Sequence, residues 1–160
     1  MNNFFFIRKK INLSHNLVLA SKSQIRKKIL KRSGLDFSVY PSNIDEKEIK
    51  KEINTINPKK IALELAKSKA LQVGLRFPES LVIGLDQVCW SKGKIFNKPG
   101  NKYNALKQLK LLNGNAHNQY SALCIAYKSK IIWRYIETAE LKMNKLTDKE
   151  INNYVIMDNP

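Results

Sequence analysis

An α/β fold is the class that this 160-residue chain predicts. Short apolar segments typical of strands alternate along it with segments that repeat apolar residues at helical spacing. Several helical segments also begin with capping residues and end at Gly or Asn. The length suits a single domain, which would bury roughly two-thirds of its unfolded surface.

The composition gives no sign of secretion or of a membrane span. The apolar run at residues 4–7 is short and precedes its cations, which reverses the order of a secretory signal. No window approaches the ~20 apolar residues of a transmembrane helix. Cys89 and Cys124 form no metal-binding or redox pattern, so free thiols are expected. We therefore expect a cytoplasmic protein without a membrane partner.

The net charge of +16 has two interpretations. Nine Lys or Arg residues precede Asp36, the first acid, and such a basic segment is typical of proteins that bind nucleic acid or phosphate-rich ligands. The alternative is a coding bias toward Lys, Asn and Ile. Aromatic residues are not interleaved with the cations as a single-strand binding surface requires, so nucleic acid is not the expected partner.

A candidate anion site follows the first predicted strand. Residues 1–15 are expected to be an extension, residues 16–20 a buried strand, and residues 24–33 a helix. Ser21, Ser23 and Arg26 lie where that strand passes into the helix. Free N–H groups and the helix dipole favour phosphate there, and an arginine can bind two oxygens. The alternative is ordinary capping by Ser23 beside a solvated arginine.

Two adjacent acids, Asp45 and Glu46, follow a second predicted strand over 36–40. In a basic region they suit a magnesium ligand or a base, and they equally suit the first turn of a helix. A charged loop is expected over 47–57.

Lys69 and Asp86 belong to the two most apolar predicted elements. Lys69 falls near the apolar face of a helix over 58–76, where it either extends to solvent or reaches a phosphate. Asp86 lies at the carboxyl end of a central buried strand over 81–89, where open α/β sheets hold ligands. The alternative is that Asp86 merely starts a turn.

The second half of the chain adds strands, helices and one more candidate cation. Lys98 stands in a Pro-Gly loop after a predicted hairpin. The other expected elements are strands over 88–91, 94–96, 117–127 and 131–142, a helix over 102–112, and a final helix that begins with the capping box Thr147–Glu150.

These candidates fit the chemistry of phosphoanhydride hydrolysis if the fold brings them together. Three cations and a helix N-terminus would hold a triphosphate, and the carboxylates would hold a divalent metal and activate water.

The order and spacing of these groups resemble one family, the Maf nucleoside triphosphate pyrophosphatases. The resemblance covers residues 16–160. Its motifs are Leu19-Ala20-Ser21-x-Ser23-x-x-Arg26, Ile44-Asp45-Glu46, Leu65-Ala66-x-x-Lys69-Ala70, Ile83-Gly84-x-Asp86-Gln87-Val88, Lys98-Pro99 and Leu112-x-Gly114. It implies an elongated mixed sheet flanked by helices, with two lobes around a central cleft as in ITPase-like folds. Such proteins are often paired as homodimers.

The resemblance also implies a reaction and a role for each candidate. A hydrolase of this kind cleaves a nucleoside triphosphate between the α and β phosphates with Mg or Mn. Asp86 would accept the proton of the attacking water, and Glu46 would help to hold the metal with Asp86. Asp45 is a further candidate ligand. The residues expected to grip phosphates are Ser21, Ser23, Arg26, Lys69 and Lys98.

Gln87 and Ile25 are the expected determinants of the substrate. The Asp-Gln-Val sequence at 86–88 resembles the branch of the family that acts on 7-methyl-GTP, and Asn153-Tyr154-Val155 is closer to that branch. Ile25 departs from it, because that branch can place tryptophan there, and isoleucine lacks the aromatic face that attracts a cationic base.

Family members continue past the position of Pro160 with a Gly-rich segment, a closing strand and a helix. The domain over 16–160 is therefore expected to lack its C-terminal segment and to leave apolar surface uncovered. The alternative function is that of a non-catalytic relic that binds nucleotide or a partner.

Overall fold

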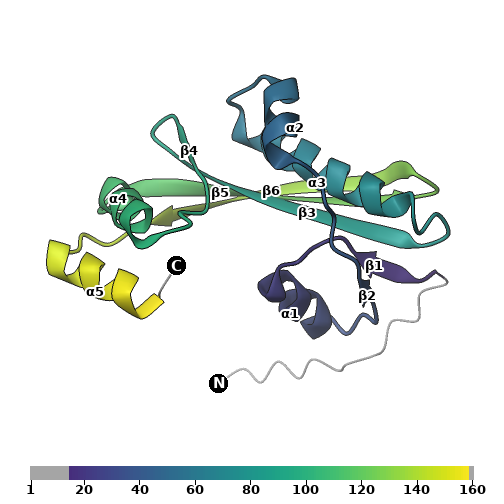
Figure 1. The fold of residues 1–160 in the computed structure, drawn as a ribbon, viewed down its shortest axis with the longest axis horizontal. Helices are drawn as coiled ribbons and strands as arrows, with labels where there is room; N and C mark the ends of the chain where they lie inside the picture. The colour runs from purple at the N-terminus through teal and green to yellow at the C-terminus, as the bar shows by residue number, and fades with distance from the viewer. Residues whose placement is uncertain (1–14, 159–160) are drawn as a thin grey trace.

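The computed structural model describes residues 15–158 (Figure 1). The predicted extension over 1–15 thus lies outside the described residues, except for His15. The elements, in chain order, are β1 (Leu17–Leu19), α1 (Gln24–Arg32), β2 (Ser38–Val39), α2 (Glu46–Ile53), α3 (Pro58–Gly74), β3 (Leu81–Ser91), β4 (Lys94–Phe96), α4 (Lys102–Leu112), β5 (Ala116–Tyr127), β6 (Lys130–Lys142) and α5 (Asp148–Asp158).

A single mixed sheet with helices on both faces confirms the predicted α/β class. Its strands are ordered β2-β1-β3-β5-β6, and β4 pairs with one end of β3. The pairs β1–β2 and β1–β3 are parallel, whereas β3–β4, β3–β5 and β5–β6 are antiparallel. The long strands β3, β5 and β6 span the molecule, with β1 and β2 toward one end and α4 and α5 at the other (Figure 1). Among the described residues, no helix has the length and apolarity to cross a bilayer.

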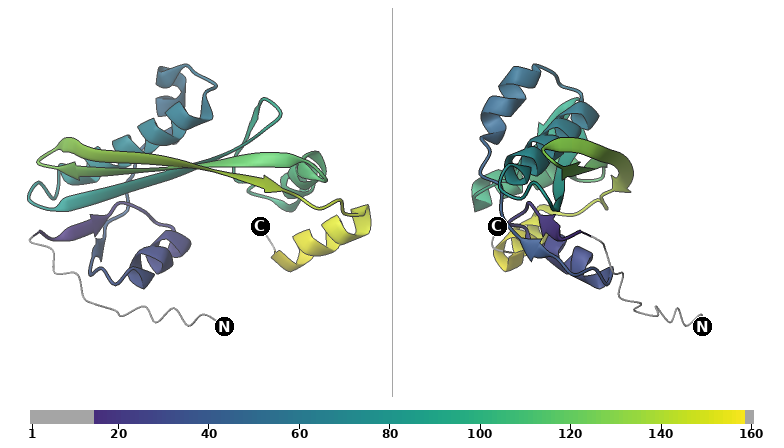
Figure 2. Two further views of the ribbon diagram at one scale, coloured as in Figure 1. Left: turned by 180° about the vertical axis from the view of Figure 1, so that it is seen from behind. Right: turned by 90° about the vertical axis from the view of Figure 1, so that its right-hand side faces the viewer.

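The main core lies between α3 and the sheet. Figures 1 and 2 show α2 and α3 on one side of the sheet and α1 and α5 on the other. The apolar face of α3, including Ile61, Leu65 and Val73, packs on Val82 and Ala122 of the sheet. All five side chains are at least 97% removed from water, and burial of this kind contributes about 1.5–3 kcal/mol for each large aliphatic side chain.

Gly84 determines how closely α3 approaches β3. A Cβ atom at this position would lie 2.1 Å from the carbonyl oxygen of Ala66 and 2.7 Å from the backbone nitrogen of Ala70. Successive side chains of a strand point to opposite faces, so Gly84 and Asp86 both face α3. The absence of a side chain at Gly84 therefore brings the backbone of α3, and Lys69 with it, down to the level of Asp86.

The opposite face of the sheet carries a smaller core. Leu17, Leu19 and Ile83 are buried there, and they pack with the half-buried Leu30 and Phe37. Most of β6 is exposed. Several large apolar side chains of α1 and β6 are exposed: Ile25 and Ile29 on α1, and Ile132, Trp133, Tyr135 and Leu141 on β6.

Two predictions about the first half of the chain are wrong. The strand expected over 36–40 is only the two-residue β2, and the charged loop expected over 47–57 contains the helix α2. Asp45 caps that helix, and Asn54 ends it in the left-handed conformation with φ 43°. The strand expected over 81–89 and the hairpin strand over 88–91 form one continuous strand, β3.

Candidate active site

Three elements converge on the ammonium group of Lys69. Lys69 on α3 donates a hydrogen bond from Nζ to Oδ1 of Asp86 on β3 at 2.5 Å. The same nitrogen lies 2.7 Å from Oε1 of Glu46, the first residue of α2. Lys69 and Asp86 are each only 7% exposed. Lys69 thus extends neither into solvent nor along an apolar surface, because it bridges two carboxylates within the fold.

The two carboxylates of this cluster differ in their electrostatic environment. Burial raises the pKa of Asp86 above its usual range, although the nearby Lys69 opposes this shift. Burial also acts to raise the pKa of Glu46, but the hydrogen bond and the charge of Lys69 outweigh it, and the net pKa is lowered. A carboxylate with a raised pKa is the better proton acceptor near neutral pH, so Asp86 is the stronger candidate base.

The predicted anion segment lies beside this cluster. Arg26 donates from Nη1 to Oγ of Ser21 at 3.4 Å, and the backbone N–H of Ser23 donates to the same oxygen at 3.2 Å. Ser23 is the N-cap of α1, because its Oγ accepts the backbone N–H of Arg26 at 3.4 Å. The charge of Arg26 also acts to lower the pKa of both Glu46 and Asp86. Ser23 therefore caps α1, and Arg26 lies near enough to Glu46 and Asp86 to affect their pKa values.

Lys98 lies in an exposed loop that is anchored on either side of it. The side-chain oxygen of Asn97 accepts a hydrogen bond from Nζ of Lys50 at 3.1 Å, and Nε2 of Gln108 donates to the carbonyl of Asn97 at 3.0 Å. Asn104 donates to the carbonyl of Pro99 at 3.0 Å. Sequence reasoning missed Lys50, which links this loop to α2, the helix that carries Glu46. No local pattern in the sequence signals that link.

The two expected specificity residues lie outside the cluster. Gln87 is exposed and, by the alternation of β3, points to the face opposite Asp86. Ile25 lies on α1 with 70% of its surface exposed.

Asp45 serves as the N-cap of α2. Its Oδ1 accepts the backbone N–H groups of Lys47 at 2.9 Å and Glu48 at 3.1 Å. These two hydrogen bonds lower the pKa of Asp45 below its ordinary 3.8, and the one from Glu48 has the larger effect. Because the pKa of Asp45 is lower in the folded state, its ionised carboxylate stabilises the folded protein above the ordinary pKa of aspartate. That stabilisation is lost as the pH falls through the lowered, folded-state pKa.

We expect Asp45→Ala to lower the midpoint of thermal unfolding by roughly a few degrees at neutral pH, whereas Asp45→Asn should retain most of the wild-type value. Asparagine and aspartate are comparable N-caps, and alanine is a poor one. Circular dichroism melts of the three proteins check this. An asparagine variant as unstable as the alanine variant would show that the carboxylate charge, and not the cap, is what stabilises α2.

Glu46 and Asp86 suit a hard divalent cation. Their oxygens already share one cation, the ammonium of Lys69. Among residues 15–158 there is no cluster of three or more His, Cys, Asp or Glu side chains that could hold a metal alone. Two carboxylates are nevertheless the usual protein contribution to a magnesium ion that takes its other ligands from phosphate oxygens and water. The donor set therefore fits a metal that binds together with a phosphate ligand.

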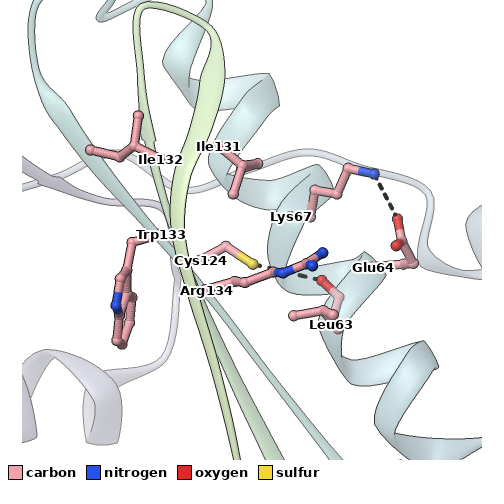
Figure 3. Close-up of a pocket in the computed structure, with 8 residues that line it drawn as sticks. All are labelled: Leu63, Glu64, Lys67, Cys124, Ile131, Ile132, Trp133 and Arg134. Atoms are coloured by element: carbon pink, nitrogen blue, oxygen red, sulfur yellow. Dashed lines mark hydrogen bonds and ion pairs between the residues drawn. The ribbon is translucent and has the colours of Figure 1, made fainter.

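A separate pocket of about 230 Å³ lies between α3 and β6. Figure 3 shows Lys67 paired with Glu64 and the thiol of Cys124 directed toward the carbonyl of Leu63. The Nζ of Lys67 lies 3.1 Å from Oε2 of Glu64. Its lining residues are Leu63, Glu64, Lys67, Cys124, Ile131, Ile132, Trp133 and Arg134. None of the predicted site residues lines this pocket.

Comparison with known proteins identifies the family. The family model described as "Maf-like protein" matches residues 16–160. The chain belongs to the Maf family. The resemblance predicted from the motifs is thereby confirmed.

Curated relatives of this Maf protein carry names that agree with the predicted enzyme class. The chain is 43% identical over 144 residues to a nucleoside triphosphate pyrophosphatase of Legionella pneumophila (strain Philadelphia 1), covering 90% of this chain and 72% of the relative. It is 39% identical to a protein of the same name from Pelagibacter ubique, covering 87% and 72%. It is 36% identical to a 7-methyl-GTP pyrophosphatase of Bartonella henselae, covering 89% and 72%. These names denote hydrolases that act on phosphoanhydrides.

Among solved structures, this Maf protein is similar to a HAM1 protein from Coxiella burnetii. The match has a TM-score of 0.48 and 14% identity, and it covers 80% of this chain and 72% of the other.

Proposed function

We propose that this chain hydrolyses nucleoside triphosphates between the α and β phosphates. The observation that carries the proposal is the buried contact of Lys69 with Asp86, joined by the half-exposed Glu46 and set beside Arg26 and Ser21 in a member of the Maf family. Cations and carboxylates held this closely on separate elements are what phosphoryl transfer needs, since positioning and charge stabilisation supply most of the catalysis. The proposed catalytic unit is residues 16–160.

Water is the nucleophile in this proposal. Asp86 accepts one proton of the water, the water oxygen bonds to the α phosphorus, and the bridging P–O bond to the β phosphate breaks. The products are a nucleoside monophosphate and pyrophosphate. A divalent metal, Mg or Mn, would be held by Glu46 and Asp86 and would neutralise charge on the phosphate oxygens when bound.

The remaining cluster residues hold the triphosphate. Arg26 presents a planar guanidinium to phosphate oxygens, and Ser21 and Ser23 add hydroxyl donors at the N-terminus of α1. Lys69 would exchange one of its carboxylates for a phosphate oxygen, and Lys98, in the loop after β4, would add a further cation to the phosphates.

The substrate that we favour is 7-methyl-GTP or a related modified nucleotide. The support is the Asp-Gln-Val sequence around Gln87 and the 36% identity to a 7-methyl-GTP pyrophosphatase. The exposed Ile25 offers apolar surface to a base without an aromatic face, so a cationic base gains less there than on a tryptophan.

The test is pyrophosphate release from 7-methyl-GTP, GTP, dTTP and UTP, each with Mg and with Mn. We expect 7-methyl-GTP to be cleaved with the highest kcat/KM. Leading activity on dTTP or UTP would overturn the base preference while leaving the reaction intact. Absence of release from all four by folded protein would overturn the reaction.

The second candidate is a family member that binds nucleotide or a partner without turnover. The exposed apolar side chains of β6, including Trp133 and Tyr135, favour it because such surfaces commonly mark contact sites. Nucleotide binding measured by calorimetry, without any pyrophosphate release, would support this candidate.

We further place the protein in the cytoplasm and propose that it pairs as a homodimer. Cys89 and Cys124 are both free, which suits a reducing compartment. Light scattering coupled to size-exclusion chromatography measures the assembly state.

A further inference from the structure

One edge of the central strand β3 is interrupted. On that edge β1 pairs with Leu81–Ile83 and β4 pairs with Cys89–Ser91. Between them no described strand pairs with Gly84–Val88, while the other edge pairs with β5 from Val82 to Trp90 without a break. At about 3.3 Å per residue, the six steps from Ile83 to Cys89 span roughly 20 Å. The sheet therefore has an open edge in its middle.

The hydrogen bonds of Leu81 and Ile83 show which backbone groups of β3 point toward this edge. The N–H of Leu81 donates to Asn16 at 2.9 Å, and the carbonyl of Ile83 accepts the N–H of Ala20 at 2.8 Å. Backbone groups alternate in direction along a strand, so those of Leu85 and Gln87 also point away from β5. Within the described part of the chain, neither residue has a backbone hydrogen bond on this side.

This open edge lies within the candidate active site. Asp86, whose carboxylate binds Lys69, is the residue between Leu85 and Gln87. Unpaired backbone N–H and C=O groups need a partner from water or from a ligand. Here the interruption includes Asp86, the carboxylate to which we assign the proton transfer.

We propose that the backbone groups of Leu85 and Gln87 bind the nucleobase of the substrate. The inference rests on the proposed function, and it identifies the part of the site that recognises the nucleobase. The edge presents donors and acceptors in alternation, whereas phosphate oxygens at neutral pH only accept and would be repelled by the carbonyls. A nucleobase carries N–H and C=O groups side by side on its Watson–Crick edge, which is the complementary pattern.

The proposal makes a chemical distinction between two methylated guanines. A methyl group at N7 is remote from the Watson–Crick edge and leaves its hydrogen bonds intact. A methyl group at N1 removes the N–H donor and adds bulk at the point of contact. The enzyme should therefore accept 7-methyl-GTP and discriminate against 1-methyl-GTP.

Amide hydrogen exchange followed by NMR tests the geometry directly. In the free protein, the amides of Leu85 and Gln87 should exchange faster than those of Asp86 and Val88, which point toward β5. Addition of GMP should slow exchange at Leu85 and Gln87, and pyrophosphate alone should not. Equal protection by pyrophosphate, or no protection at saturating GMP, would overturn the proposal. Pyrophosphate release by the same preparation reports separately on the proposed function.

A pair of variants separates the backbone from the side chain. Gln87→Pro removes the N–H that faces the gap and spares the pairing with β5, since proline is tolerated where a strand edge is unpaired. Gln87→Ala keeps that N–H and removes the side chain. We expect the proline variant to raise KM for GTP about 5- to 10-fold above that of the alanine variant. Equal KM values would overturn the proposal, and the exchange experiment decides if the proline variant does not fold.

Discussion

Asp86→Asn should reduce the rate of pyrophosphate release by about 10²- to 10⁴-fold, which is the usual contribution of a general base. Asparagine keeps the shape of the side chain and a hydrogen-bond acceptor for Lys69 but cannot take up the proton of the attacking water. The measurement is kcat on the best substrate, together with the thermal unfolding midpoint. Since Glu46 still pairs with Lys69, the variant should remain folded.

The matched control is Asp148→Asn. Asp148 pairs with Lys110 at 3.0 Å on the exposed surface between α4 and α5, and exposed ion pairs contribute little. Its kcat should equal that of the wild type. If Asp86→Asn kept more than a tenth of the wild-type kcat, another group would have to accept the proton.

Gly84→Ala should destabilise the protein by about 1–3 kcal/mol, as overpacking of a core typically does. The new Cβ would lie 2.1 Å from the carbonyl oxygen of Ala66, and a backbone atom cannot rotate away. The helix α3 must therefore move outward, and Lys69 moves with it away from Asp86. Urea unfolding measures the loss of stability, and kcat should fall as well.

Gly74→Ala is the control for this change. A Cβ atom at Gly74, the last residue of α3, would lie 3.7 Å from Cβ of Ala126, which is an ordinary contact. Alanine is the better helix former, so this variant should be neutral or more stable by up to about 1 kcal/mol. Equal stability of Gly84→Ala and the wild type would mean that the α3–β3 contact is looser than the structure shows.

The sequence was sufficient to predict most elements and to single out the candidate groups. Capping residues marked α1, α3 and α5, and the apolar run around Gly84 marked β3. It was not sufficient for α2, because Ile49 and Ile53 are too few to form a clear apolar stripe among the six charged residues of that helix. The strand expected over 36–40 is shorter because only Ser38 and Val39 pair with β1, although the N–H of Tyr40 still donates to the carbonyl of Leu19 at 3.0 Å.

The arrangement of the candidate site could be predicted only in part. Asp45 and Glu46 are adjacent in sequence and were assigned together, but successive side chains at a helix start point in different directions. One therefore caps α2 and the other reaches Lys69. Likewise Gln87 follows Asp86, yet strand alternation sends it to the other face. The bridge made by Lys69 depends on how α3 is seated over Gly84, a tertiary relation that no local pattern contains.

The exposed strand β6 and the net charge of +16 have opposite effects on the behaviour of the protein in solution. An edge strand of thirteen residues that carries Ile132, Trp133 and Tyr135 invites pairing with another copy. Electrostatic repulsion between highly cationic copies opposes that pairing at low ionic strength. Salt weakens the repulsion, because the Debye length falls to about 10 Å at 0.1 M ionic strength. Purification in high salt, the usual choice for a basic protein, should therefore promote aggregation of this one.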